Sequence, residues 1–166
     1  SYMNTYFLVK TLHILSSTVV FGTGLGSAYY SWRAWRSGQV ETIAVTFRHL
    51  VFADWVFTAT TGIIQPVTGI WMMYLAGWGF TFTTPWIFWA LVLYVLAGTC
   101  WLPVLWLQIR VHKLAEHALH NREPIPDICR TYMRCWFVLG GRAIINLIVI
   151  FYLLVNKPAW PVTFIG

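Results

Sequence analysis

Charged residues are scarce in this sequence. They make up 10% of its 166 residues, whereas hydrophobic residues make up 58%. A soluble domain usually carries about 25% charged residues, so the composition excludes a soluble globular protein. Acidic residues are rarer still, with 5 Asp and Glu against 11 Lys and Arg, which gives a net charge of +6. In a soluble protein that excess would favour nucleic-acid binding. Here most basic residues lie between long apolar runs, so we expect a lipid bilayer as the partner and no nucleic acid.

The sequence also lacks the motifs of soluble enzymes. It contains no HExxH zinc motif, no nucleophile elbow and no phosphate-binding loop, and its three cysteines form no CxxC pair. The first residues, Ser1 to Asn4, have no basic charge, and the apolar run that follows is too long for a signal-peptide core. We therefore expect the first apolar run to be retained as a membrane span.

Four apolar runs of about 20 residues or more occupy most of the chain, and each is long enough to cross ~30 Å of hydrocarbon. We predict an all-α, polytopic membrane protein in which a four-transmembrane-helix bundle forms a single domain over residues 1–166. The predicted spans are about 5–32, 48–76, 85–110 and 134–156, with a cytoplasmic helical extension over about 108–120. Lys and Arg gather in two of the connecting loops. The positive-inside rule then places both termini outside, which is periplasmic for a protein of the bacterial inner membrane.

Small residues and a proline interrupt the first two runs. Gly22 and Gly26 form a small-xxx-small pair, which predicts close helix approach inside the bundle or toward a second copy. Pro66 lies beside Gln65 and Thr68. A proline inside a span frees a backbone carbonyl, so we expect a neighbouring side chain or a ligand to satisfy it.

His13 is the main candidate for function, because ionisable groups inside a membrane are expensive and are usually functional. A neutral imidazole in a helical bundle can ligate haem iron. The alternative is a histidine that hydrogen-bonds to a helix neighbour such as Gln65. We expect no second histidine at this depth, so haem would be five-coordinate, would use Lys10 or a methionine such as Met72, or would be shared across an oligomer.

A second candidate site lies at the opposite side of the bundle. His49 opens the second helix and His112 closes the third, so antiparallel packing predicts similar depths. They would bind a haem as a pair, with Arg48, Arg110 or Arg142 meeting its propionates. The other interpretation is two interfacial histidines in a basic loop region.

Two smaller groupings involve the same residues. His112, Glu116 and His120 fall on one helix face and would form either a metal site or a solvated surface. Asp54 and Arg142 lie at depths that a long arginine can partly span. They would form a buried ion pair, unless Arg142 contacts a propionate or a substrate instead.

Several short segments, in the same order along the chain, resemble the HemJ-type family of integral-membrane protoporphyrinogen oxidases. They are Lys10-Thr11-Leu12-His13-Ile14, Thr68-Gly69-Ile70-Trp71-Met72 and Val155-Asn156-Lys157-Pro158. The resemblance implies haem b bound through the first-span histidine, which is His13 here. Members of that family carry a lysine early in the third span, whereas this chain reads Pro85-Trp86-Ile87-Phe88-Trp89. The resemblance therefore implies a relative of HemJ rather than HemJ itself.

Three functions remain open from the sequence. The first is a membrane cytochrome with haem b that moves electrons between a membrane quinol or small reductant and an acceptor. The second is HemJ-like oxidation of a porphyrin substrate. The third is a non-redox subunit that anchors a partner protein, and a homodimer is compatible with each.

Overall fold

The computed structural model describes residues 1–77 and 84–157, which form helices and no strand. The elements are α1 (Tyr2–Ser37), α2 (Val40–Ala53), the π-helical turn η1 (Asp54–Thr58), α3 (Ala59–Leu75), α4 (Pro85–His120) and α5 (Ile128–Asn156). Because α2, η1 and α3 form one continuous helix, four helices in this part of the chain are long and apolar enough to cross a membrane. The prediction of an all-α protein with four membrane-spanning helices is confirmed.

The connection after α1 is shorter than the sequence predicted. It consists of Gly38 and Gln39, and Gly38 adopts the left-handed conformation (φ 67°) that ends many helices. The next helix begins at Val40 rather than near residue 48. Its first turns are stable because Ile43 and Phe47 bury one apolar face against the rest of the bundle.

The cytoplasmic extension predicted over residues 108–120 is the unbroken continuation of α4. Val111, Ala115 and Ala118 are almost fully buried on one face of it. Its apolar face packs inside the bundle, chiefly against α2 and α5.

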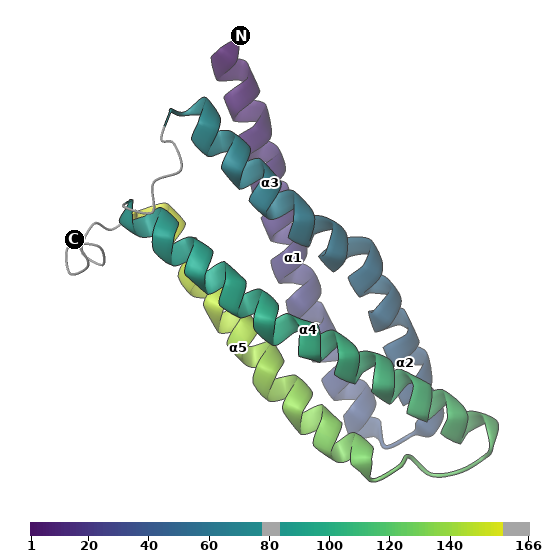
Figure 1. The fold of residues 1–166 in the computed structure, drawn as a ribbon. Helices are drawn as coiled ribbons and strands as arrows, with labels where there is room; N and C mark the ends of the chain where they lie inside the picture. The colour runs from purple at the N-terminus through teal and green to yellow at the C-terminus, as the bar shows by residue number, and fades with distance from the viewer. Residues whose placement is uncertain (78–83, 158–166) are drawn as a thin grey trace.

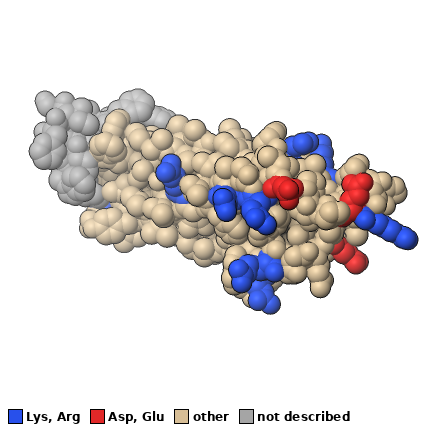
Figure 2. All heavy atoms as spheres, turned by 90° about the horizontal axis from the view of Figure 1, so that it is seen from below, with Lys and Arg blue, Asp and Glu red and all other residues tan. Residues whose placement is uncertain are grey.

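The two ends of the bundle differ in charge. The N-terminus, the end of α3, the start of α4 and the end of α5 share one end (Figure 1), which we call the terminal end. The α1–α2 and α4–α5 connections form the other, which we call the basic end. Figure 2 shows the charged side chains on one face gathered toward the basic end. The N-terminus and the end of α5 thus belong to the weakly charged end, and the outside location of the termini remains a prediction.

The best-packed core of the protein lies at the basic end. Its eight most central members are Ala34, Ile43, Ala44, Phe47, Leu50, Val111, Ala115 and Met133. Large apolar side chains elsewhere are often exposed, including Ile63 and Val95 in the middle of α3 and α4. This difference is expected for a bundle that projects from a membrane. In the part surrounded by water, apolar side chains must be buried in the core, whereas in the part surrounded by lipid they can stay exposed.

Many of the exposed and half-buried aromatic residues lie in two belts, one near each end of the spans, whereas a few, such as Phe21 and Tyr94, lie between them. The basic-end belt contains Tyr29, Tyr30, Trp32, Phe52, Trp55, Trp106 and Tyr132. The terminal-end belt contains Tyr2, Tyr6, Trp71, Tyr74, Trp86 and Tyr152. On α4 and on α5 the two belts are about 20 residues apart, which is about 30 Å of helix. Aromatic side chains favour the two membrane interfaces, so the belts bracket one thickness of hydrocarbon.

Glycines of α1 do not pack as the sequence predicted. A Cβ added at Gly22 or Gly26 would meet no atom within 4 Å, so neither makes a close helix contact inside this chain. Instead, a Cβ at Gly24 would lie 3.3 Å from Ile144 of α5. The alternative that Gly22 and Gly26 face a second copy remains untested.

Candidate functional site

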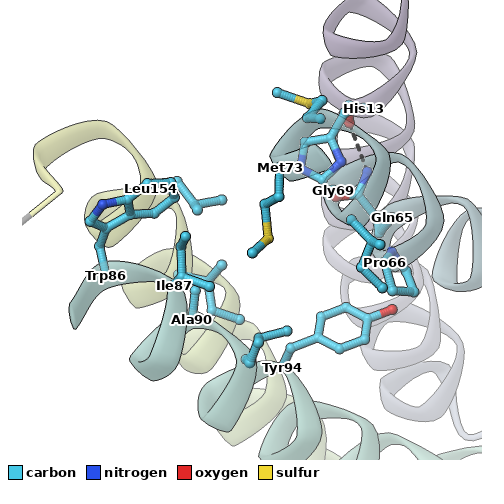
Figure 3. Close-up of a pocket in the computed structure, with 14 residues that line it drawn as sticks. His13, Gln65, Pro66, Gly69, Met73, Trp86, Ile87, Ala90, Tyr94 and Leu154 are labelled. Carbon is cyan, nitrogen blue, oxygen red and sulfur yellow. Dashed lines mark hydrogen bonds between the residues drawn. The ribbon is translucent and has the colours of Figure 1, made fainter. Parts of the chain in front are cut away.

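A cavity of about 150 Å³ lies toward the terminal end, between two pairs of helices. α1 packs against α3 and α4 packs against α5, and the two pairs diverge toward this end (Figure 1). Figure 3 shows His13, Gln65 and Met73 on one side of the cavity and Trp86 and Tyr94 on the other. The lining is largely apolar, and His13 is the only histidine among the described residues that form it.

The hydrogen bonds around His13 favour one tautomer of its ring. Nδ1 lies 2.7 Å from the hydroxyl of Thr68. That hydroxyl donates its own proton to the carbonyl of Ile64, at 2.7 Å, or of Gln65, at 3.2 Å. A hydroxyl has one proton to give, so when Thr68 donates to one of these carbonyls it accepts a hydrogen bond from Nδ1–H. In this tautomer Nε2 keeps a free lone pair, which is the form of imidazole that ligates a metal.

Residues of α3 hold the imidazole and its helix in place. A Cβ added at Gly69 would lie 3.3 Å from Cε1 of His13, so the ring rests against a position where a side chain would crowd it. The amide of Gln65 donates to the carbonyl of His13 at 2.7 Å and to the hydroxyl of Ser16. The side-chain amide of Gln65 thus bonds to the helix of His13. The ring of His13 does hydrogen-bond to a neighbouring helix, as the alternative interpretation of the sequence expected, but its side-chain partner is Thr68.

Pro66 leaves a backbone carbonyl for a side chain to satisfy, as the sequence predicted. A proline has no N–H, so the carbonyl of Gly62, four residues earlier, loses its helical donor. The hydroxyl of Tyr94 donates to that carbonyl. This bond ties α3 to α4 at the edge of the cavity, and Pro66 and Tyr94 both line it.

We expect Tyr94→Phe to lower the free energy of unfolding by about 0.5–2 kcal/mol, because it leaves the Gly62 carbonyl without a donor. Pro66→Ala supplies a backbone N–H at the position that lacks one. The Tyr94 substitution should therefore have a smaller effect in a Pro66→Ala background. Unfolding of the four proteins by dodecyl sulfate in mixed micelles measures both values, and equal effects in the two backgrounds would contradict the account.

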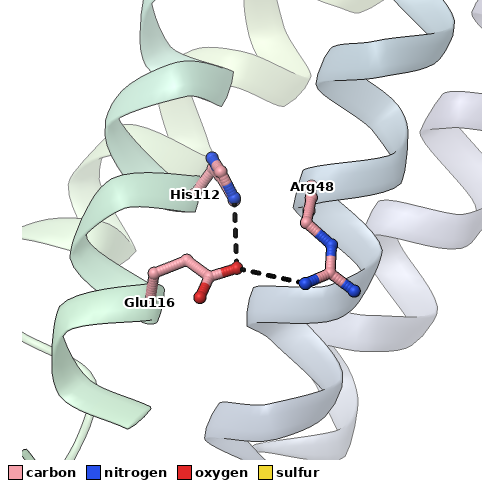
Figure 4. Close-up of polar contacts among 3 residues, drawn as sticks. All are labelled: Arg48, His112 and Glu116. Carbon is pink, nitrogen blue, oxygen red and sulfur yellow. Dashed lines mark hydrogen bonds and ion pairs between the residues drawn. The ribbon is translucent and has the colours of Figure 1, made fainter. Parts of the chain in front are cut away.

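The second predicted site, at the basic end, is arranged differently from the paired-histidine interpretation. Nε2 of His112 lies 3.3 Å from a carboxylate oxygen of Glu116 on the same helix, and that oxygen lies 3.9 Å from Arg48 of α2 (Figure 4). Arg48 and His49 are both exposed, and Arg48 is the one that reaches Glu116 of α4. The metal interpretation of His112, Glu116 and His120 gains no support, because the described residues contain no group of three or more potential metal ligands.

Asp54 has partners that the sequence did not suggest. Its carboxylate accepts hydrogen bonds from Thr58, at 3.0 Å, and from the amide of Gln108. The carbonyl of that amide accepts from the indole of Trp136 at 3.2 Å. Asp54 begins the π-helical turn, a feature that often marks functional positions in helices. The predicted ion pair with Arg142 is not formed, and Arg142 is exposed on α5 instead.

The sequence pointed to Thr68 and Gly69 but not to their contacts with the ring of His13. Those contacts depend on how α3 packs against α1. In contrast, the sequence did suggest a methionine near His13, although it named Met72 and not Met73. The structure adds Met73 to Met72 as a cavity-lining methionine.

These features define a four-helix membrane protein with a histidine-containing cavity among its helices. A family model of predicted integral membrane proteins, DUF2269, matches residues 7–158. The chain therefore belongs to the DUF2269 family. Searches of curated proteins and of solved structures returned no match.

Proposed function

We propose that this protein binds haem b in the cavity at the terminal end, with Nε2 of His13 as an axial ligand, and that it functions in electron transfer or oxidoreduction in the membrane. The observation that supports the proposal best is the Thr68–His13 hydrogen bond, because it leaves a bare nitrogen on a histidine that lines a largely apolar cavity. Bound haem would supply one-electron chemistry.

The residues around His13 fit this group in three respects. Trp86 and Tyr94 offer aromatic surfaces to a flat macrocycle. The amino group of Lys157 lies 5.3 Å from the ring centroid of Trp86, so a cation is present at the terminal-end rim, where a propionate would face the interface. Met73 projects into the space between the helix pairs (Figure 3) and can move, because its side chain is unbranched and flexible.

The size of the cavity sets a condition on the proposal. A volume of about 150 Å³ is smaller than a haem macrocycle. Binding therefore requires Met73 and other flexible side chains to move aside, with entry between α3 and α4, the helices of different pairs. The Tyr94–Gly62 hydrogen bond ties α3 to α4 and would limit how deeply the two helices can separate.

The test is an absorption spectrum of detergent-purified protein, produced with ample haem, in the oxidised and dithionite-reduced states. We expect the Soret and α bands of a b-type cytochrome, at about one haem per chain. A colourless protein that also fails to take up added hemin would overturn the proposal.

HemJ-like oxidation of protoporphyrinogen is a narrower form of the same proposal, since a porphyrin substrate would need the same flat apolar space. The region that carries a lysine in that family contributes Trp86 and Ile87 to the cavity here. Because this region has no lysine, we expect added protoporphyrinogen to be oxidised no faster with the protein than without it. Faster oxidation would place the chain with the enzymes of that family.

Thr68→Val removes the group that accepts from Nδ1–H, and we expect it to weaken haem binding about 10- to 100-fold, the usual effect of removing such a supporting bond. Thr68→Ser keeps a hydroxyl and should bind haem nearly as the wild type does. Titration of the haem-free proteins with hemin measures both affinities. Equal affinities of the Val and Ser variants would show that the tautomer does not govern binding.

A further inference from the structure

Arg142 lies on α5 halfway between the two aromatic belts. Tyr132 and Tyr152 belong to the belts, and Arg142 is about ten residues, or about 15 Å of helix, from each. An arginine near a helix end can extend its charge to the interface. Arg142 is at the middle of the span, so its charge is held within the hydrocarbon region.

The surroundings of Arg142 leave its guanidinium exposed on an apolar surface. Val138, Ile145 and Val149 on the same side of α5 are also exposed. Within residues 1–77 and 84–157, the guanidinium has no ion pair and no hydrogen bond. The nearest acid in the spans, Asp54, is buried and bonded to Thr58 and Gln108. A charge in hydrocarbon is expensive unless it is paired, so this surface requires a partner.

A second copy of the chain does not provide the opposite charge. The sequence has five acidic residues, Glu41, Asp54, Glu116, Glu123 and Asp127. Asp54 lies beside Trp55 of the basic-end belt, and the other four lie beyond that belt at the basic end. No copy can bring one of these carboxylates to the middle of the membrane, and a symmetric contact through α5 would bring two arginines together.

The backbone next to Arg142 suits a helix as the partner. A Cβ added at Gly141, about 100° around the helix from Arg142, would meet no atom within 4 Å, so the flank of this face is open. Small residues of this kind allow a second helix to approach closely within a membrane. An arginine can then bind a carboxylate through two parallel hydrogen bonds.

We propose that the face of α5 around Arg142 docks a transmembrane helix of a different protein, which places an Asp or Glu side chain against Arg142 near the middle of the bilayer. This inference does not depend on haem binding. The sequence left open that this protein is a membrane subunit that anchors a partner. The inference specifies that such a partner has a transmembrane helix with an acidic side chain.

The test uses a synthetic transmembrane helix of about 20 Leu and Ala residues with one central Glu. Two matched peptides carry Gln or Leu at that position. Energy transfer between labelled peptide and labelled protein, in vesicles of zwitterionic lipid, measures association. We expect the Glu peptide to bind the wild-type protein at least about 10-fold more tightly than the Leu peptide does, since a charged pair in a dry interface contributes more than that factor.

The protein variants distinguish an effect of the Arg142 charge from a loss of folding. Arg142→Gln should lose the preference for the Glu peptide, whereas Arg142→Lys should keep most of it. Arg134→Gln serves as the matched control, because Arg134 is an exposed arginine of the same helix near the basic-end belt. It should bind as the wild type does. Helical circular dichroism and elution volume confirm that each variant is folded.

Three results would overturn the proposal. The first is equal binding of the Glu and Leu peptides to the wild type. The second is a preference that disappears when anionic lipid is added, which would identify a lipid phosphate as the ligand of Arg142. The third is a homodimer that Arg142→Gln dissociates while peptide binding stays unchanged, which would assign the face to a second copy.

Discussion

His13→Gly abolishes haem binding, and imidazole added to the buffer restores it: this is the largest effect that we expect from a single substitution. Glycine removes the proposed axial ligand and leaves a space beside Gly69, where the ring of His13 now rests. Free imidazole can occupy that space, ligate the haem iron through its bare nitrogen and donate its N–H to Thr68. The haem content of the purified variant, measured as the pyridine complex, should fall to background and should recover with imidazole.

His49→Ala and His112→Ala are the controls for this experiment. His49 is exposed and His112 is bonded to Glu116 at the other end of the bundle. Both variants should keep the haem content of the wild type. If His13→Gly retains its haem while either control loses it, the haem site belongs at the basic end, and the cavity near His13 needs another explanation.

Phe47→Ala should lower the free energy of unfolding by about 3–5 kcal/mol, the second of the two largest effects. Phe47 is fully buried (0% exposed) in the core at the basic end. Its ring leaves water on folding if that end projects from the membrane, so truncation loses transfer free energy and creates a cavity. Dodecyl sulfate titration followed by circular dichroism gives the value.

Phe52→Ala is the matched control, because Phe52 lies on the same helix but is 69% exposed in the basic-end belt. Its ring contacts lipid or detergent in the folded and the unfolded states, so the change in stability should be below about 1 kcal/mol. Similar losses at both positions would contradict the division into an aqueous core and a lipid-facing region.

The hydrophobic pattern predicted the four helices well and their ends less well. The first two spans were predicted to be separated by residues 33–47, yet only Gly38 and Gln39 lie between the helices. A window of apolar residues detects hydrocarbon-spanning segments, but it does not detect helix that continues into water on an amphipathic face. Ile43, Phe47 and Val111 provide such a face, and their partners are distant in sequence.

The candidate site was predictable only in part. His13 was identifiable because a histidine inside an apolar run is unusual, and the role of Pro66 followed from its missing N–H. That Tyr94 bonds to the carbonyl of Gly62, and that Thr68 bonds to His13, depends on how α3 packs against α4 and α1. The Asp54–Arg142 pair failed for the same reason: similar depth along two helices does not mean that two side chains face each other.

The sequence by itself determined that this is a membrane protein with four spans and one basic end, because the solvation of apolar and charged groups depends on composition along the chain. The positions of its acids left Asp54 open as a partner of Arg142, and the structure excluded that pair by bonding Asp54 to Thr58 and Gln108. Only the tertiary structure decided which polar groups meet. Within a membrane, helix contacts are selected by shape and hydrogen bonds rather than by hydrophobicity, so the sequence pattern does not specify helix rotation. That rotation places Thr68 and Gly69 against His13 and leaves Arg142 on the surface.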